Sequence, residues 1–207
     1  MFNLPKSTVV DKFIPKTAFY NKLNITTGVK EEFVNKIDKI TWKNKISEDT
    51  IGITKTNEIE ELQIFEIILK DKSIPKNVIR TIAKSIPYPI LFKLVYKEGF
   101  YYSIGLYQDK KLVDLYFSEW NYNLNFNFSG INLSVIYEKI VKEIIKEQQN
   151  EQKFDIIIET SNKKKTLEKE ITLLQNKITI EKQFNKKVEL NKQLFQKQTE
   201  LEEIING

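Results

Sequence analysis

The stretch Glu181–Gln193, EKQFNKKVELNKQ, decides whether the last quarter of this chain is a rod or a hairpin. It lies in a charged run that begins near residue 163 and contains neither Pro nor Gly before the final residue. Lys, Glu, Gln and Leu dominate this run, a composition typical of long helices. The pattern of apolar residues on either side of the stretch shows what the helices bury.

Two apolar seams flank the stretch, and they do not share a register. Each has the alternating spacing of three and four residues that indicates a coiled coil. Continuing the first seam through the stretch leads to Phe184, Val188 and Phe195 rather than to the second seam. The first seam consists of Leu167, Ile171, Leu174 and Ile178, and the second of Leu190, Leu194, Leu201 and Ile204.

Two arrangements satisfy this pattern. A single helix of roughly 40 residues spans about 60 Å and needs a partner for both seams. A hairpin that turns within Ile180–Asn185 packs one seam on the other without a second chain. We favour the hairpin, in which Asn185 supplies the left-handed residue of the turn. The seam residues, together with Phe184, are then the candidate interaction residues, for a partner protein or a second copy.

The remainder of the chain has the composition of one ordinary folded domain with an appendage. The 207 residues are sufficient for both. We place a globular domain at 1–150 and the long-helix segment at 151–207. The start of the chain lacks a signal peptide pattern, and no window approaches the roughly 20 apolar residues of a membrane helix. We therefore expect a cytoplasmic protein that does not enter a membrane.

Residues 1–150 predict an α+β domain with a mainly antiparallel sheet and packed helices. Helical spacing predicts helices near Pro15, from Thr27 (as N-cap) to Ile40, from Ser73 (as N-cap) to Pro87, and over 131–147. Residues 58–70 predict a central strand because apolar residues occupy both of its faces. Residues 88–120 predict a meander of three strands with turns near Gly99 and at 108–111. Residues 121–130 predict either a further strand or an extended segment.

Composition excludes several kinds of chemistry. The chain has no Cys and no His, which excludes disulfides, Cys nucleophiles, imidazole catalysis and Cys or His metal sites. Its glycines are scattered and form no phosphate-binding loop, so we expect no nucleotide cofactor. The candidates that remain for a metal-dependent nuclease are weak: they are Glu60, Glu66, Lys70 and Asp114. Solvated or paired charges on the strand are the simpler interpretation, and we expect no metal.

A net charge of +5 is a mild signal for nucleic acid. Lysines at 163–165 and 186–187 are candidates for phosphate contacts. The aromatic candidates for stacking on bases are Trp42, Tyr101, Tyr102 and Trp120. The alternative is that the lysines form a solvated helix face and that the aromatic residues belong to the core.

Three segments together resemble a family of bacterial proteins known as a domain of unknown function. They are the opening MFNLPKST, the middle IPYPILFKLVY…GFYYSIGLY and the closing EKQFNKKVELN. The resemblance covers nearly the whole chain and brings no catalytic residues with it. It implies a setting near restriction-modification and helicase genes, and hence an accessory part in DNA processing or phage defence. We therefore expect a non-catalytic adaptor that binds a partner through its C-terminal coiled coil, with an enzyme or a nucleic-acid-binding protein as the alternative.

Overall fold

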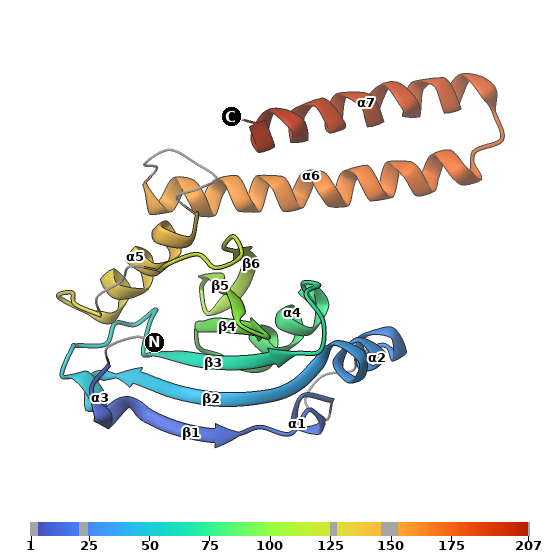
Figure 1. The fold of residues 1–207 in the computed structure, drawn as a ribbon. Coiled ribbons are helices and arrows are strands. Elements are labelled where there is room, and N and C mark those ends of the chain that lie inside the picture. Colours follow the sequence, from blue (N-terminus) through green and yellow to red (C-terminus); the bar gives the residue numbers. More distant parts are fainter. Residues whose placement is uncertain (1–3, 21–24, 125–127, 146–152, 207) are drawn as a thin grey trace. The chain divides into compact units, whose positions relative to one another are not determined.

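A mixed sheet of six strands organises the first part of the chain (Figure 1). The computed structural model describes residues 4–20, 25–124, 128–145 and 153–206. The strands lie in chain order, and all neighbours are antiparallel except β3 and β4, which are parallel. The predicted α+β class is confirmed. The strands are β1 Val9–Phe13, β2 Ile37–Ser47, β3 Glu61–Leu69, β4 Ile90–Tyr96, β5 Gly99–Gln108 and β6 Lys111–Phe117.

Helices pack on this sheet, and two further helices follow it in the chain. They are η1 Lys6–Thr8, α1 Thr17–Tyr20, α2 Thr27–Lys36, α3 Glu48–Ile51, α4 Lys76–Ser85, α5 Leu133–Ile145, α6 Phe154–Ile180 and α7 Phe184–Asn206. Among the described residues, no helix combines the length and the apolar character needed to cross a membrane. By backbone contacts the chain divides into two compact units, Met1–Gln148 and Gln149–Gly207. The expected boundary near residue 150 lies outside the described residues.

The prediction that one helix runs from Thr27 to Ile40 is wrong at its C-terminal end. Helix α2 stops at Lys36, and its N-cap is Thr26, whose side chain accepts a hydrogen bond from the Val29 N–H. Ile37 and Ile40 belong to β2, where they lie opposite Leu69 and Ile67 of β3 and are fully buried. Pairing with β3 therefore outweighs the helical spacing that these residues also satisfy.

Strand β3 lies between β2 and β4, so the predicted central strand is confirmed in a shorter form. Helix α4 connects β3 to the parallel strand β4, which makes a crossover connection. Ser73 does not cap α4 as predicted, because Pro75 takes the N-cap position and Ser73 bonds to Asp71 instead. The β5–β6 turn is tight, with left-handed backbone at Asp109 and Lys110.

The main core lies between one face of the sheet and helices α2 and α4. Phe33 of α2 and Ile79 of α4 pack there with Phe65, Phe92 and Tyr101 of the strands. Alternate strand residues point to the opposite face, where α5 contacts β3, β5 and β6. The predicted helix over 131–147 is confirmed over Leu133–Ile145, and its apolar stripe is buried: Ile136, Tyr137, Ile140, Val141, Ile144 and Ile145.

Residues 121–130 lie between β6 and α5 in the chain, and those of them that the structure describes form no strand. Phe126 lies outside the described residues.

Candidate functional site: the helical hairpin

Helices α6 and α7 pack against each other as a hairpin, so the predicted fold-back is confirmed (Figure 1). The two helices are joined by Glu181, Lys182 and Gln183. We call the first and second predicted seams together the inner seam of the hairpin. On α6 it begins with the buried Leu167 and Ile171. The remaining predicted seam residues are half-buried: Leu174, Ile178, Leu190, Leu194, Leu201 and Ile204.

The inner seam of α7 contains a charged residue, Lys197, that the predicted seam did not include. Lys197 falls between Leu194 and Leu201, at the next position of the three-four spacing, and it is half-buried. Its ammonium nitrogen lies 3.2 Å from a carboxylate oxygen of Glu170 in α6 and 3.3 Å from one of Glu200. These hydrogen bonds raise the pKa of Lys197. A charge at one seam position favours a single register, because any slip separates it from its partner.

The turn uses a different device from the predicted left-handed Asn185. Asn185 lies within α7, and the backbone turns instead at Glu181, which has extended dihedrals. One Glu181 carboxylate oxygen accepts the backbone N–H groups of Lys182 and Gln183, each at 2.8 Å. These bonds lower the pKa of the Glu181 carboxyl, the Gln183 N–H having the larger effect. A carboxylate that accepts the N–H groups of the two connecting residues therefore takes the place of the glycine or asparagine that such turns commonly use.

A second apolar stripe on α7 is exposed. We name it the outer stripe and define it as Phe184, Val188 and Phe195, of which Phe184 is 78% exposed and Phe195 71%. These are the residues that the first seam reaches when it is extended through the turn. Phe195 directly follows the inner residue Leu194, and consecutive helical residues differ by about 100° around the axis. The outer stripe therefore lies beside the inner seam rather than within it.

Helix α6 also exposes apolar residues, at Leu173 and Ile180. Leu173 precedes the inner residue Leu174, whereas Phe195 follows Leu194. Because the two helices run in opposite directions, these offsets place the exposed residues of α6 and α7 on opposite faces of the hairpin. The hairpin thus closes one apolar seam by itself and leaves apolar side chains on both outer faces.

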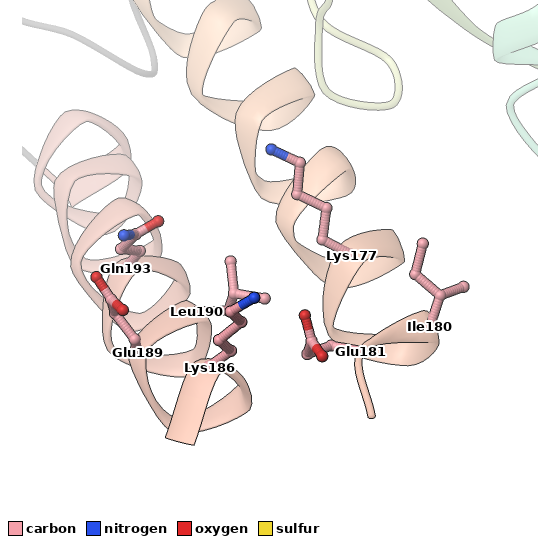
Figure 2. A pocket seen from close by; sticks show the side chains of 7 residues that line it. All are labelled: Lys177, Ile180, Glu181, Lys186, Glu189, Leu190 and Gln193. Atoms are coloured by element: carbon pink, nitrogen blue, oxygen red, sulfur yellow. The ribbon is translucent and has the colours of Figure 1, made fainter. Parts of the chain in front are cut away.

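An open pocket of about 380 Å³ lies at the turn end of the hairpin (Figure 2). Ile180 and Leu190 supply its apolar surface, and charged side chains from both helices surround them. Figure 2 shows Lys186 and Leu190 projecting from α7 towards the end of α6. The full lining is Lys177, Ile180, Glu181, Lys186, Glu189, Leu190 and Gln193.

The four candidate catalytic residues each have a separate environment. Glu60 precedes β3 and forms an ion pair with Lys110 at 2.5 Å. Glu66 lies in β3 opposite Thr41 of β2 and Lys93 of β4.

Of the other two, Lys70 follows β3 and donates to the Val34 carbonyl at 2.8 Å. Asp114 of β6 pairs with Arg80 of α4 at 3.1 Å. The described residues contain no group of three or more Asp and Glu that could hold a metal ion.

A polar pocket of about 120 Å³, which the sequence did not indicate, lies near the start of β3. Glu61, 9% exposed, lies between Lys45, at 2.9 Å, and the Gln63 amide, at 2.5 Å. The ion pair raises the pKa of Lys45. The sequence places Glu61 and Gln63 on one face of the predicted strand, which was the only signal for this pocket. Their partner Lys45 belongs to β2 and is distant in sequence.

The chain belongs to the family described as a domain of unknown function, DUF4391, whose model matches residues 2–201. The match covers almost the entire chain, including the sheet and most of the hairpin. No curated protein and no solved structure matches the chain.

Proposed function

Starting from membership of a family whose function is not assigned, we propose that this protein is a non-catalytic adaptor. Its hairpin α6–α7 binds a helix of a partner protein. In keeping with the genomic setting that the resemblance implies, the partner is a DNA-acting protein of a restriction or defence system.

The observation that carries this proposal is the outer stripe. The hairpin already closes its inner seam, so Phe184 and Phe195 contribute nothing to that closure while exposing most of their surface. Phe184 and Phe195, with Val188 between them, expose apolar surface along one side of α7. Exposed apolar side chains that gather on one face mark interaction sites, because large apolar areas are unfavourable in water. A row with helical spacing matches a groove-binding helix with apolar residues at every third and fourth position.

Charge along α7 sets the kind of helix that fits. The first half of α7 contains Lys186, Lys187 and Lys192, and its last turns contain Glu200, Glu202 and Glu203. A partner helix with acidic residues near the turn of the hairpin and basic residues near its open end complements this gradient. Such pairing fixes the direction in which the partner helix lies.

The test compares capture of partners from the native host by three forms of the full chain. These are the natural sequence, the variant Phe184→Ser/Phe195→Ser and the control Asn185→Ser/Gln196→Ser, which alters exposed polar residues of the same helix. We expect the stripe variant to lose the captured protein and the control to keep it. The captured protein, once purified, should bind the natural chain and bind the stripe variant at least about tenfold more weakly.

Two outcomes contradict the proposal. One is a captured protein that binds the stripe variant as well as the natural chain. The other is that light scattering shows the stripe to mediate only self-association, with no foreign protein lost from the variant.

A further inference from the structure

Four lysines lie over aromatic rings at one end of the strands, and we call this row of strand ends an edge of the sheet. This edge is where β3 and β4 end, β5 begins and β6 ends. The rings are half-buried, so each presents part of its surface to solvent. The distances from the ammonium nitrogen to the ring centre are 5.0 Å for Lys72 on Trp120, 6.0 Å for Lys76 on Phe117, 4.8 Å for Lys93 on Phe100 and 5.3 Å for Lys97 on Tyr96.

Two of these pairs pack on the same buried ring, and we call them together the basic aromatic edge, defined as Lys72, Lys76, Phe117 and Trp120. The ring of the buried Tyr101 connects its parts, with its centre 5.5 Å from that of Trp120 and 6.4 Å from that of Phe117. Trp120 lies directly over Gly99, where an added Cβ would be 2.3 Å from the indole. The indole is therefore held at the edge of the sheet by close packing.

The lysines of this edge differ from those at the opposite edge in their partners. Among the described residues, no carboxylate forms an ion pair with Lys72, Lys76, Lys93 or Lys97. At the opposite edge, by contrast, Lys45 pairs with Glu61 and Lys110 with Glu60.

The charge balance at the basic aromatic edge is positive. Lys36 and Lys70 add two further cations, which donate to the Ser73 hydroxyl and to a backbone carbonyl. The nearby carboxylates are Asp71, Glu98 and Glu119, with Glu66 opposite Lys93 and Glu32 bonded to Asn77 beside Lys76. Six lysines thus face five carboxylates, and among the described residues the four lysines on the rings have no ion-pair partner. An anion is the ligand that these four lysines lack.

We propose that the basic aromatic edge binds single-stranded nucleic acid. The ammonium groups of Lys72 and Lys76 move from the rings to phosphates, and unpaired bases stack on the vacated faces of Trp120 and Phe117. Cation–ring contacts are weak at exposed sites and exchange readily for phosphate contacts. Single strands are favoured over duplexes because a base stacks on a side chain only when it is free of its neighbours. This site belongs to the sheet unit and does not depend on the role of the hairpin.

The test measures binding of a fluorescent oligothymidylate to the full chain at low salt, by anisotropy and by quenching of tryptophan emission. The variant Lys72→Glu/Lys76→Glu is compared with Lys84→Glu/Lys111→Glu, which makes the same change in net charge at exposed residues of the opposite edge. We expect the first variant to lose at least about tenfold in affinity and the second to lose less than about threefold. Trp120→Phe should retain most of the affinity and lose most of the quenching.

Three results would overturn this assignment. They are no binding of the natural chain at low salt, an equal loss in both charge variants, and equal affinity for a duplex or for heparin. An equal loss in both variants would show attraction by net charge alone. Equal affinity for heparin would show that the rings take no part.

Discussion

At the scale of single residues, the buried hydroxyls of Tyr137 and Tyr101 differ in their hydrogen bonds: the first has partners on both sides and the second has none. Tyr137 of α5 donates to the Gly105 carbonyl at 2.9 Å and accepts the Tyr107 N–H at 2.8 Å. It thereby joins α5 to the irregular end of β5, where the register with β6 shifts. The Tyr101 hydroxyl is equally buried and has no hydrogen-bond partner in the described structure.

Removing these two hydroxyls should therefore have opposite consequences. We expect Tyr137→Phe to lower the free energy of unfolding by about 1–3 kcal/mol, because it leaves a buried carbonyl and a buried N–H without a partner. Tyr101→Phe should leave stability unchanged or raise it slightly, because it removes a polar group that is desolvated without compensation. Denaturant unfolding followed by tryptophan emission measures both. An equal loss in the two variants would contradict the hydrogen-bond assignment.

At the scale of elements, the hairpin separates apolar residues that its own packing needs from those that it leaves exposed. Leu167 is 3% exposed and Leu173 is 60% exposed, although both are leucines of the same helix. The inner seam stabilises the pair of helices, and the Lys197–Glu170 ion pair across it favours one register. The exposed residues take no part in that packing, so under the proposed function stability depends on the inner seam and partner binding on the other faces.

A matched pair of leucine substitutions tests this division. Leu167→Ala should cost about 2–4 kcal/mol, because it leaves a cavity in a packed seam. Leu173→Ala should change stability by less than about 0.5 kcal/mol, because its side chain is already largely in water. Helical circular dichroism during denaturant unfolding reports both variants. A large loss in Leu173→Ala would mean that its face is covered rather than free.

At the scale of the whole molecule, the two units differ in the groups that titrate at high pH. All nine tyrosines and both tryptophans lie before residue 149, so none belongs to the hairpin. Burial raises the pKa of Tyr101, Tyr107 and Tyr137 well above the ordinary value. The unfolded chain releases these protons at about pH 10, whereas the folded chain retains them. Stability from these groups is therefore complete below about pH 10 and is lost as the pH rises further.

We therefore expect the sheet unit to lose stability selectively in alkali. Tryptophan emission, which reports only this unit, should show a midpoint of denaturant unfolding that is constant up to about pH 10 and falls steadily above it. The Tyr137→Phe variant should show a smaller fall, since it has one fewer buried phenol to ionise. The part of the tyrosinate absorbance that Tyr137→Phe removes should appear together with unfolding, and its appearance well before unfolding would contradict the raised pKa of Tyr137.

Features that depend on local spacing could be predicted from the sequence. The stripe of α5, the meander β4–β6 and the two seams of the hairpin follow from residues close in the chain, because a helix or a tight turn brings together positions a few residues apart. Short segments along the chain likewise indicated the family. No catalytic centre was indicated with any strength, and the weak candidates Glu60, Glu66, Lys70 and Asp114 have separate partners.

Features that depend on pairing between distant segments could not be predicted from the sequence and became visible in the tertiary structure. Ile37 and Ile40 have the spacing of one helix face, which a regular strand would place on opposite sides. Both belong to the same core cluster from β2, whose register with β3 shifts between Ile37 and Lys39. The pairing of Lys45 with Glu61 and the placing of Lys72 on Trp120 join segments that no periodicity relates. The same holds for the outer stripe, since Phe184, Val188 and Phe195 are exposed only because the hairpin closes on the other face. A spacing rule states which residues share a face, but only packing determines which face is covered.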